Sequence, residues 1–210
     1  MLVIALDTAT TDLVAGIVDG DRVVAQTCVA TRAHNERLMP EITGLLQQAN
    51  VKFADLGAVV VGCGPGPFTG LRVGMSTASA LGQALGIPVH GVCTHDAVAA
   101  ELGGDVLVVT DARRREVYWA RYAKGARVAG PDVCKPADLV SPAVDVVSVP
   151  EQLAKLLPVD APSVTYQPPT PAGLVAAADL AAKPEPLVPL YLRRPDAVPP
   201  KQTPKSPALP

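Results

Sequence analysis

Short apolar runs alternate with stretches of helical periodicity through the first half of the chain. Continuous aliphatic runs that are bounded by turn residues predict β-strands. The predicted strands span residues 2–6, 13–18, 22–30, 58–61, 89–93, 105–110 and 116–122. Because Asp19-Gly20-Asp21 is a hairpin signal between the second and third runs, we expect the chain to open with a three-stranded meander.

Two amphipathic helices are predicted between these strands, followed by a short one at residues 96–102. In residues 35–50 the apolar positions recur at helical spacing and form one stripe, which contains Leu38, Ile42, Leu45, Leu46 and Ala49. That stripe fits two roles, either cover for the domain's own sheet or contact with a partner.

The helix predicted at residues 69–85 is apolar or small most of the way round, and charge is nearly absent after Arg72. Small residues let another helix approach closely. Since such a helix needs cover on more than one side, we expect a partner helix to pack on it. The candidate interface residues of the two helices are Leu38, Ile42, Leu45, Leu71, Met75, Ala78, Gly82 and Leu85.

A glycine-rich loop at residues 62–72 connects the fourth strand to this helix. A loop of this kind exposes backbone N–H groups at the helix start, which favours anions. However, it lacks the Gly-Lys-Ser/Thr of a P-loop and the spacing of a dinucleotide fingerprint. Pro65 and Pro67 also remove two backbone donors. The loop is therefore better suited to shaping the backbone than to binding phosphate.

Composition narrows the class of protein. Of 210 residues, 49% are apolar and 3% aromatic, and the formal net charge is -2. Neither half of the chain is strongly basic, which argues against autonomous nucleic-acid binding. The longest uncharged stretch, residues 73–94, contains Pro88 and many polar residues and is a poor membrane span. Four separated cysteines and the lack of a basic leader after Met1 predict a cytoplasmic protein with free thiols.

Proline content divides the chain. All but four of the 22 prolines follow residue 130, and they separate short apolar runs. We expect an N-terminal subdomain at residues 1–104, a smaller, proline-broken subdomain at 105–194, and a disordered tail at 195–210.

Three patches resemble the bacterial TsaB (YeaZ) family: residues 7–10, residues 64–74 and residues 111–114. A fourth, weaker patch at residues 189–193 is similar to that family's C-terminal signature. The resemblance implies an α/β actin-like ATPase (ribonuclease H-like) fold with two subdomains, each a mixed sheet flanked by helices. The chain departs from the family pattern at Pro67, where the family usually has Ser.

The same resemblance implies a role in forming N6-threonylcarbamoyladenosine in tRNA. Members of the family are not the transferase. They bind and activate a TsaD-type transferase together with a TsaE-type ATPase, form homodimers when alone, and meet tRNA indirectly through the complex. We therefore expect no catalytic residue, no tightly bound cofactor, and ATP and magnesium handled by the partner subunits.

Site residues have two interpretations each. Asp7, Gly64, Gly66 and Thr69 could be a vestigial nucleotide or phosphate site, although Asp7 also fits a simple turn residue. Arg113 and Arg114 could contact tRNA or a partner, or flank a solvated hairpin end. The three histidines lack metal-binding spacing, so we expect surface or capping roles and no metal site.

An autonomous actin-fold ATPase or phosphotransferase is the alternative function. It needs a second phosphate-binding turn and an adenosine pocket in the second half of the chain. The segment after residue 130 offers no clear glycine-rich motif for either.

Overall fold

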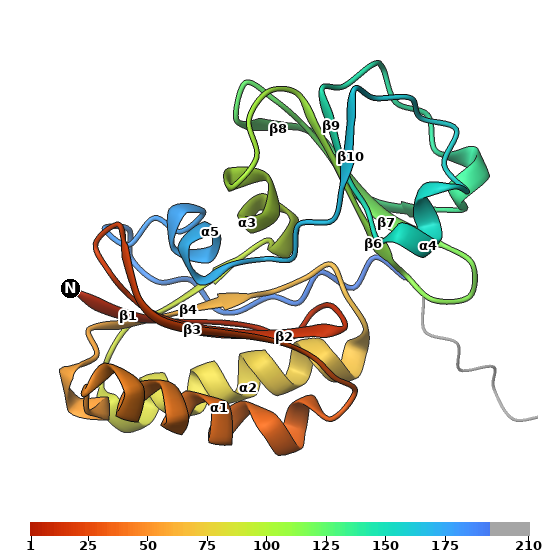
Figure 1. The fold of residues 1–210 in the computed structure, drawn as a ribbon. Helices are drawn as coiled ribbons and strands as arrows, with labels where there is room; N and C mark the ends of the chain where they lie inside the picture. Colours follow the sequence, from red (N-terminus) through yellow and green to blue (C-terminus); the bar gives the residue numbers. More distant parts are fainter. Residues whose placement is uncertain (194–210) are drawn as a thin grey trace, which may run out of the picture.

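Two five-stranded mixed sheets organise the molecule, seen in Figure 1 as two subdomains. The computed structural model describes residues 1–193, so the tail predicted at residues 195–210 lies outside the described residues. The first sheet has the order β3-β2-β1-β4-β5. Its strands are β1 (Leu2–Asp7), β2 (Asp12–Asp19), β3 (Arg22–Ala30), β4 (Ala58–Gly62) and β5 (Val89–Val92).

The first three strands form the predicted antiparallel meander, and β4 and β5 then add in parallel to β1. A parallel addition requires a crossover, and α1 (His34–Ala49) before β4 and α2 (Phe68–Leu85) before β5 supply the two crossovers on one face. The short 3-10 turn Phe53–Asp55 lies between these two helices in sequence. The opposite face carries α3 (Thr94–Ala100) and α5 (Pro171–Ala176).

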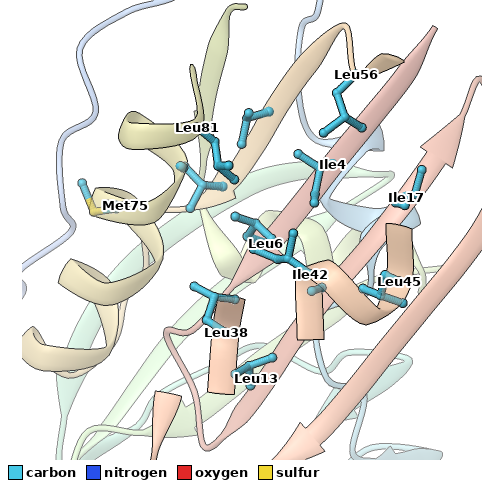
Figure 2. Close-up of a cluster of buried hydrophobic side chains, with 14 of the residues drawn as sticks. Ile4, Leu6, Leu13, Ile17, Leu38, Ile42, Leu45, Leu56, Met75 and Leu81 are labelled. Carbon is cyan, nitrogen blue, oxygen red and sulfur yellow. The ribbon is translucent and has the colours of Figure 1, made fainter. Parts of the chain in front are cut away.

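The main hydrophobic core lies between the first sheet and the α1–α2 layer. Figure 2 shows side chains from β1 and β2 directed toward those of α1, with Met75 and Leu81 of α2 at the same cluster. Ile4, Leu6 and Ile42 are fully buried. Burial of one such aliphatic side chain contributes about 1.5–3 kcal/mol, which explains why the apolar stripes determine how these elements pack.

The second sheet has the order β10-β9-β6-β7-β8. Its strands are β6 (Val106–Asp111), β7 (Val117–Ala123), β8 (Ala126–Cys134), β9 (Val146–Ser148) and β10 (Ser163–Thr165). The helix α3 packs against one face through Val98, next to Val106 and Val108. The other face is covered by a cluster that includes Leu139 and Leu153, beside the 3-10 turn Pro136–Asp138 and the short helix α4 (Glu151–Ala154).

After β10 the chain returns to the first sheet. Leu174 of α5 is buried against β1 and β4, Leu187 packs on the main core, and the Leu190 backbone N–H donates to the Cys63 carbonyl at 2.9 Å. Figure 1 shows this last, blue segment running back along the first subdomain. Part of the segment that the sequence assigned to the second subdomain therefore packs on the first sheet.

None of the helices between residues 1 and 193 has the length and apolar character that a membrane crossing requires.

Candidate functional site

Asp7 ends β1 and is fully buried. Its Oδ1 accepts a hydrogen bond from the Ala9 backbone N–H at 2.7 Å, and its Oδ2 accepts one from the Thr94 hydroxyl at 2.7 Å. Burial raises the pKa of this carboxyl to about 6, against the opposing effect of these two hydrogen bonds. A carboxyl in this setting holds the turn together, and its burial disfavours the charged form that a magnesium site would need.

Thr8 joins the same turn to the start of α2. Its hydroxyl donates to the Gly70 carbonyl at 2.7 Å and accepts from the Gly74 N–H at 3.0 Å. In an uninterrupted helix those two backbone groups bond to each other. The Thr8 side chain therefore bridges the ladder of α2 and fixes the first turns of that helix against β1.

The turn and the glycine loop are in direct backbone contact. A Cβ at Gly66 would overlap the Ala9 carbonyl oxygen, and a Cβ at Gly70 would overlap the Thr8 carbonyl oxygen. Gly64 is buried in the same junction, with its backbone N–H donating to the Thr94 hydroxyl at 3.2 Å. Three of the four residues predicted as a vestigial phosphate site thus meet in one closed junction, while Thr69 is exposed beside it.

Two neighbouring cavities open where the subdomains meet. The first, of about 360 Å³, lies between the turn and the second sheet and is lined by Asp12, Asp111, Glu151 and Tyr166. The Tyr166 hydroxyl donates to Asp12 across it. The second, of about 320 Å³, is lined by residues of both helix starts, including Arg32, His34 and Thr69. Arg113 and Pro67 line both cavities.

The eight candidate interface residues lie on the inner side of α1 and α2. Leu38, Ile42, Leu45, Leu71, Met75 and Ala78 belong to the main core, Gly82 packs under Val89, and Leu85 is partly buried on the same cluster. The sequence left two roles open for these stripes, cover of the chain's own sheet or contact with a partner. In the structure their side chains cover the first sheet. Direct contact with a partner would have to use other sides of the same helices.

The outer face of α1 and α2 is exposed yet poor in charge. α1 has no charged residue after Glu41, and α2 has none after Arg72. We define the outer helix face by its exposed residues Met39, Thr43, Gly44, Gln47, Ser76, Ala80, Gln83 and Ala84. Soluble surfaces normally carry interspersed charges, so an uncharged area of two adjacent helices is typical of a protein contact.

Comparison with known proteins identifies the family. The model of the family described as TsaD, tRNA N6-adenosine threonylcarbamoyltransferase, matches residues 26–183, most of the chain. TsaB of Escherichia coli, described as a tRNA threonylcarbamoyladenosine biosynthesis protein, is 33% identical over 129 residues, or 59% of this chain and 56% of that protein. The structure of YeaZ from Pseudomonas aeruginosa superimposes with a TM-score of 0.78 at 25% identity, covering 91% of this chain and 99% of that one. The chain belongs to the TsaB (YeaZ) family.

An uncharacterized protein of Mycobacterium tuberculosis is a nearer relative, 56% identical over 201 residues and 94% of each chain. The similarity to YeaZ confirms the predicted actin-like fold with two sheet-based subdomains. The family assignment made from the three sequence patches is confirmed as well.

The histidines of this TsaB-family chain do not gather at a site. No group of three His, Cys, Asp or Glu side chains among residues 1–193 is placed to hold a metal ion. His95 is fully buried in α3, where its Nε2 hydrogen-bonds the Thr110 hydroxyl at 2.9 Å, and burial lowers its pKa to about 3. The surface or capping role expected for His95 is wrong, because this neutral imidazole joins α3 to β6.

Arg113 and Arg114 are exposed at the tip of the hairpin between β6 and β7. The Arg113 N–H donates to Asp111 Oδ1 at 2.7 Å, which closes the tip. Sequence reasoning missed Thr94 and Tyr166, which lie 87 and 154 residues from their carboxylate partners. No local pattern links residues at that separation.

Proposed function

We propose that this chain supports the formation of threonylcarbamoyladenosine in tRNA as a non-catalytic partner of a TsaD-type transferase. The observation that carries the proposal is the outer helix face, an exposed surface on two adjacent helices that carries no charge beyond Glu41 of α1 and Arg72 of α2. Two facing helix pairs can supply the roughly 1,200–2,000 Å² that a stable interface buries. The eight residues named from the sequence then support this surface from beneath.

The closed junction supports the non-catalytic part of the proposal. Thr8 and Ala9 contact the glycine loop through backbone atoms, so a phosphate between them would require the two segments to separate. Asp7 is buried with a raised pKa and its oxygens already accept two hydrogen bonds. ATP and magnesium would accordingly be handled by the transferase and by a TsaE-type ATPase.

The chain's effect on the transferase would be allosteric. Docking on the outer helix face favours the active arrangement of the partner, and by linkage substrate binding to the partner strengthens the docking. In the absence of the transferase, the same uncharged face would pair with a second copy of the chain in a homodimer. Such a complex acts in the cytoplasm, where tRNA is modified.

One assay tests the proposal. Purified TsaD-type and TsaE-type proteins from the same cell are incubated with tRNA, ATP and a preformed activated threonylcarbamoyl donor, with and without this chain. We expect modified adenosine only when the chain is present, and no ATP turnover by the chain alone. Steady ATP turnover by the isolated chain that Asp7→Ala abolishes would instead establish the autonomous ATPase.

A further inference from the structure

Six arginines come from four separate segments that meet around the β6–β7 hairpin and the start of α2. Arg32 and Arg113 line one cavity, and Arg193 bonds the hairpin base. Arg72 lies over Phe68, whose neighbour is Tyr191. We define the six arginines as the arginine face: Arg32, Arg72, Arg113, Arg114, Arg115 and Arg193. All but Arg193 are exposed. This concentration of positive charge occurs in a chain whose formal net charge is -2.

The C-terminal segment holds one half of this face together. Arg193 donates to the Ala112 carbonyl at 3.3 Å and pairs with Glu116 at 3.4 Å, which docks it at the base of the β6–β7 hairpin. Tyr191, two residues earlier, lies against Phe68 at the start of α2, with ring centroids 5.1 Å apart. The last described segment thus joins the hairpin to α2.

An exposed aromatic stack occupies the centre of the face. The Arg72 guanidinium lies 3.7 Å from the centroid of the Phe68 ring, whose neighbour is Tyr191. Phe68 is 50% exposed and Tyr191 is 41% exposed. The Arg72 guanidinium already covers one side of the Phe68 ring and Tyr191 lies beside the ring, so another planar group would stack on the outer side of this assembly.

The hairpin tip supplies three successive arginines on left-handed backbone. Arg113, Arg114 and Arg115 have φ values of 65°, 50° and 64°. This conformation is unfavourable for residues with a Cβ and easy for glycine. Strained positions persist only where surrounding contacts hold them, here the bonds to Asp111 and from the Glu116 N–H to the Arg113 carbonyl. The tip therefore presents guanidinium groups where glycine would form the turn more easily.

Charge pairing leaves most of the face available. Four arginines of the face form no ion pair with an acidic side chain among residues 1–193: Arg32, Arg72, Arg113 and Arg115. Asp111 and Glu116 are the carboxylates at the hairpin base, and they bond the Arg113 N–H and Arg193 respectively. Arg113 also lines the cavity that contains Arg32, which brings these two arginines to one hollow at the start of α1, whereas the neighbouring cavity that Arg113 lines carries Asp12, Asp111 and Glu151.

We propose that the arginine face binds single-stranded RNA. Guanidinium groups match phosphate geometry, and exposed aromatic rings stack unpaired bases, the combination used by single-strand binding surfaces. A duplex keeps its bases stacked internally, so the Phe68–Tyr191 pair favours a loop over a helix. Only the identity of the RNA, a loop of the tRNA substrate, rests on the proposed function. An acidic protein segment is the competing occupant that the test must separate.

Fluorescence anisotropy of the full chain with a labelled stem-loop taken from the tRNA substrate, and with a loopless duplex of the same stem, tests the proposal. We expect tighter binding of the stem-loop. Arg113→Gln/Arg115→Gln should weaken binding more than tenfold at low salt. It should also flatten the plot of log affinity against log salt by about 1.4, at about 0.7 per lost phosphate contact.

Two further variants separate stacking from charge. Phe68→Leu should weaken stem-loop binding about tenfold without changing the salt slope, because base stacking is not a charge interaction. Arg22→Gln/Lys52→Gln is the matched control, because it also removes two positive charges. Arg22 pairs with Asp19 at the opposite end of the first sheet, and the segment after Lys52 reaches the same end, where the Gly57 N–H donates to the Leu2 carbonyl. This variant should change RNA binding little. Thermal unfolding of each variant confirms that it is folded.

Equal binding of stem-loop and duplex, or an equal loss in the control variant, would overturn the proposal. Polyglutamate that binds as tightly as the stem-loop, with no effect of Phe68→Leu, would assign the face to an acidic protein and overturn it too. No transferase is present in the RNA-binding measurement. A negative result there would overturn the RNA proposal alone, and a negative result in the modification assay would overturn the proposed function.

Discussion

Arginine substitutions on the two sides of α2 distinguish the core side from the partner side. Ala78 is fully buried in the main core, and Ala80 is exposed on the outer helix face. Ala78→Arg places an unpaired charge among apolar side chains, which costs about 3–5 kcal/mol, and overpacking adds about 1–3 kcal/mol. The sum of about 4–8 kcal/mol is comparable to the whole stability of a domain, about 5–15 kcal/mol. We expect Ala78→Arg to be largely unfolded or insoluble.

Ala80→Arg should leave the fold intact, because surface substitutions usually change stability by no more than about 0.5 kcal/mol. If a partner covers this position, the same arginine becomes a desolvated charge in the contact. A penalty of about 3 kcal/mol would weaken binding about a hundredfold, since each 1.4 kcal/mol changes Kd tenfold.

Urea unfolding followed by circular dichroism measures the first effect, and calorimetric titration with a TsaD-type protein measures the second. Gln47→Arg on the outer side of α1 is a companion to Ala80→Arg, since it tests the other helix of the same face. Native-like unfolding of Ala78→Arg would contradict the assignment of the inner side. Undiminished binding of Ala80→Arg would refute the outer helix face as the docking surface.

Three other substitutions test the junction and the hairpin. Gly66→Ala should lower the free energy of unfolding by about 1–3 kcal/mol because its Cβ meets the Ala9 carbonyl, whereas Gly44→Ala, on open helix surface, should raise it by about 1 kcal/mol in urea titrations. Asp7 has a folded pKa of about 6, above its unfolded value, so its contribution to stability should fall by about 2 kcal/mol as pH rises from 4 to 6. The lowered pKa of His95 changes stability with pH in the opposite direction, so the wild type is compared with Asp7→Asn, in which the His95 effect is the same. Parallel curves of unfolding free energy against pH for the two proteins would contradict the role given to Asp7. Arg115→Gly should raise the melting temperature, through about 0.5–1 kcal/mol of relieved backbone strain, while weakening RNA binding.

Local patterns in the sequence predict the elements well and their orientation poorly. The apolar stripe of α1 and the glycine loop before α2 have strong local signals, and both are where the sequence placed them. Which side of α2 faces the sheet is not decided by its sequence, because small and apolar residues occupy most of its circumference. The contact of Gly70 with Thr8 and that of Gly82 with Val89 settle it, and both depend on how the strands pair.

Average charge also conceals local concentration. A net charge of -2 argues against nucleic-acid binding only if the charges are evenly distributed. The arginine face draws its members from positions as distant as Arg32 and Arg193, which the fold brings to the β6–β7 hairpin: Arg32 shares a cavity with Arg113, and Arg193 bonds Ala112. The hydrogen bond between Asp7 and Thr94 is equally hard to predict from the sequence, because Thr94 follows the glycine loop and Asp7 precedes it.

The closed junction explains how α2 can serve two surfaces at once. Arg72, which lies over Phe68 in the first turns, belongs to the arginine face, and Ser76, Ala80, Gln83 and Ala84 belong to the outer helix face. The helix has 18 residues and is about 27 Å long at 1.5 Å per residue, so a loop of RNA at one end lies within reach of a partner docked along the rest. The two surfaces keep a fixed relation only if the start of α2 is rigid. Thr8 supplies that rigidity by bonding Gly70 and Gly74, so the contacts that close the junction also orient the helix.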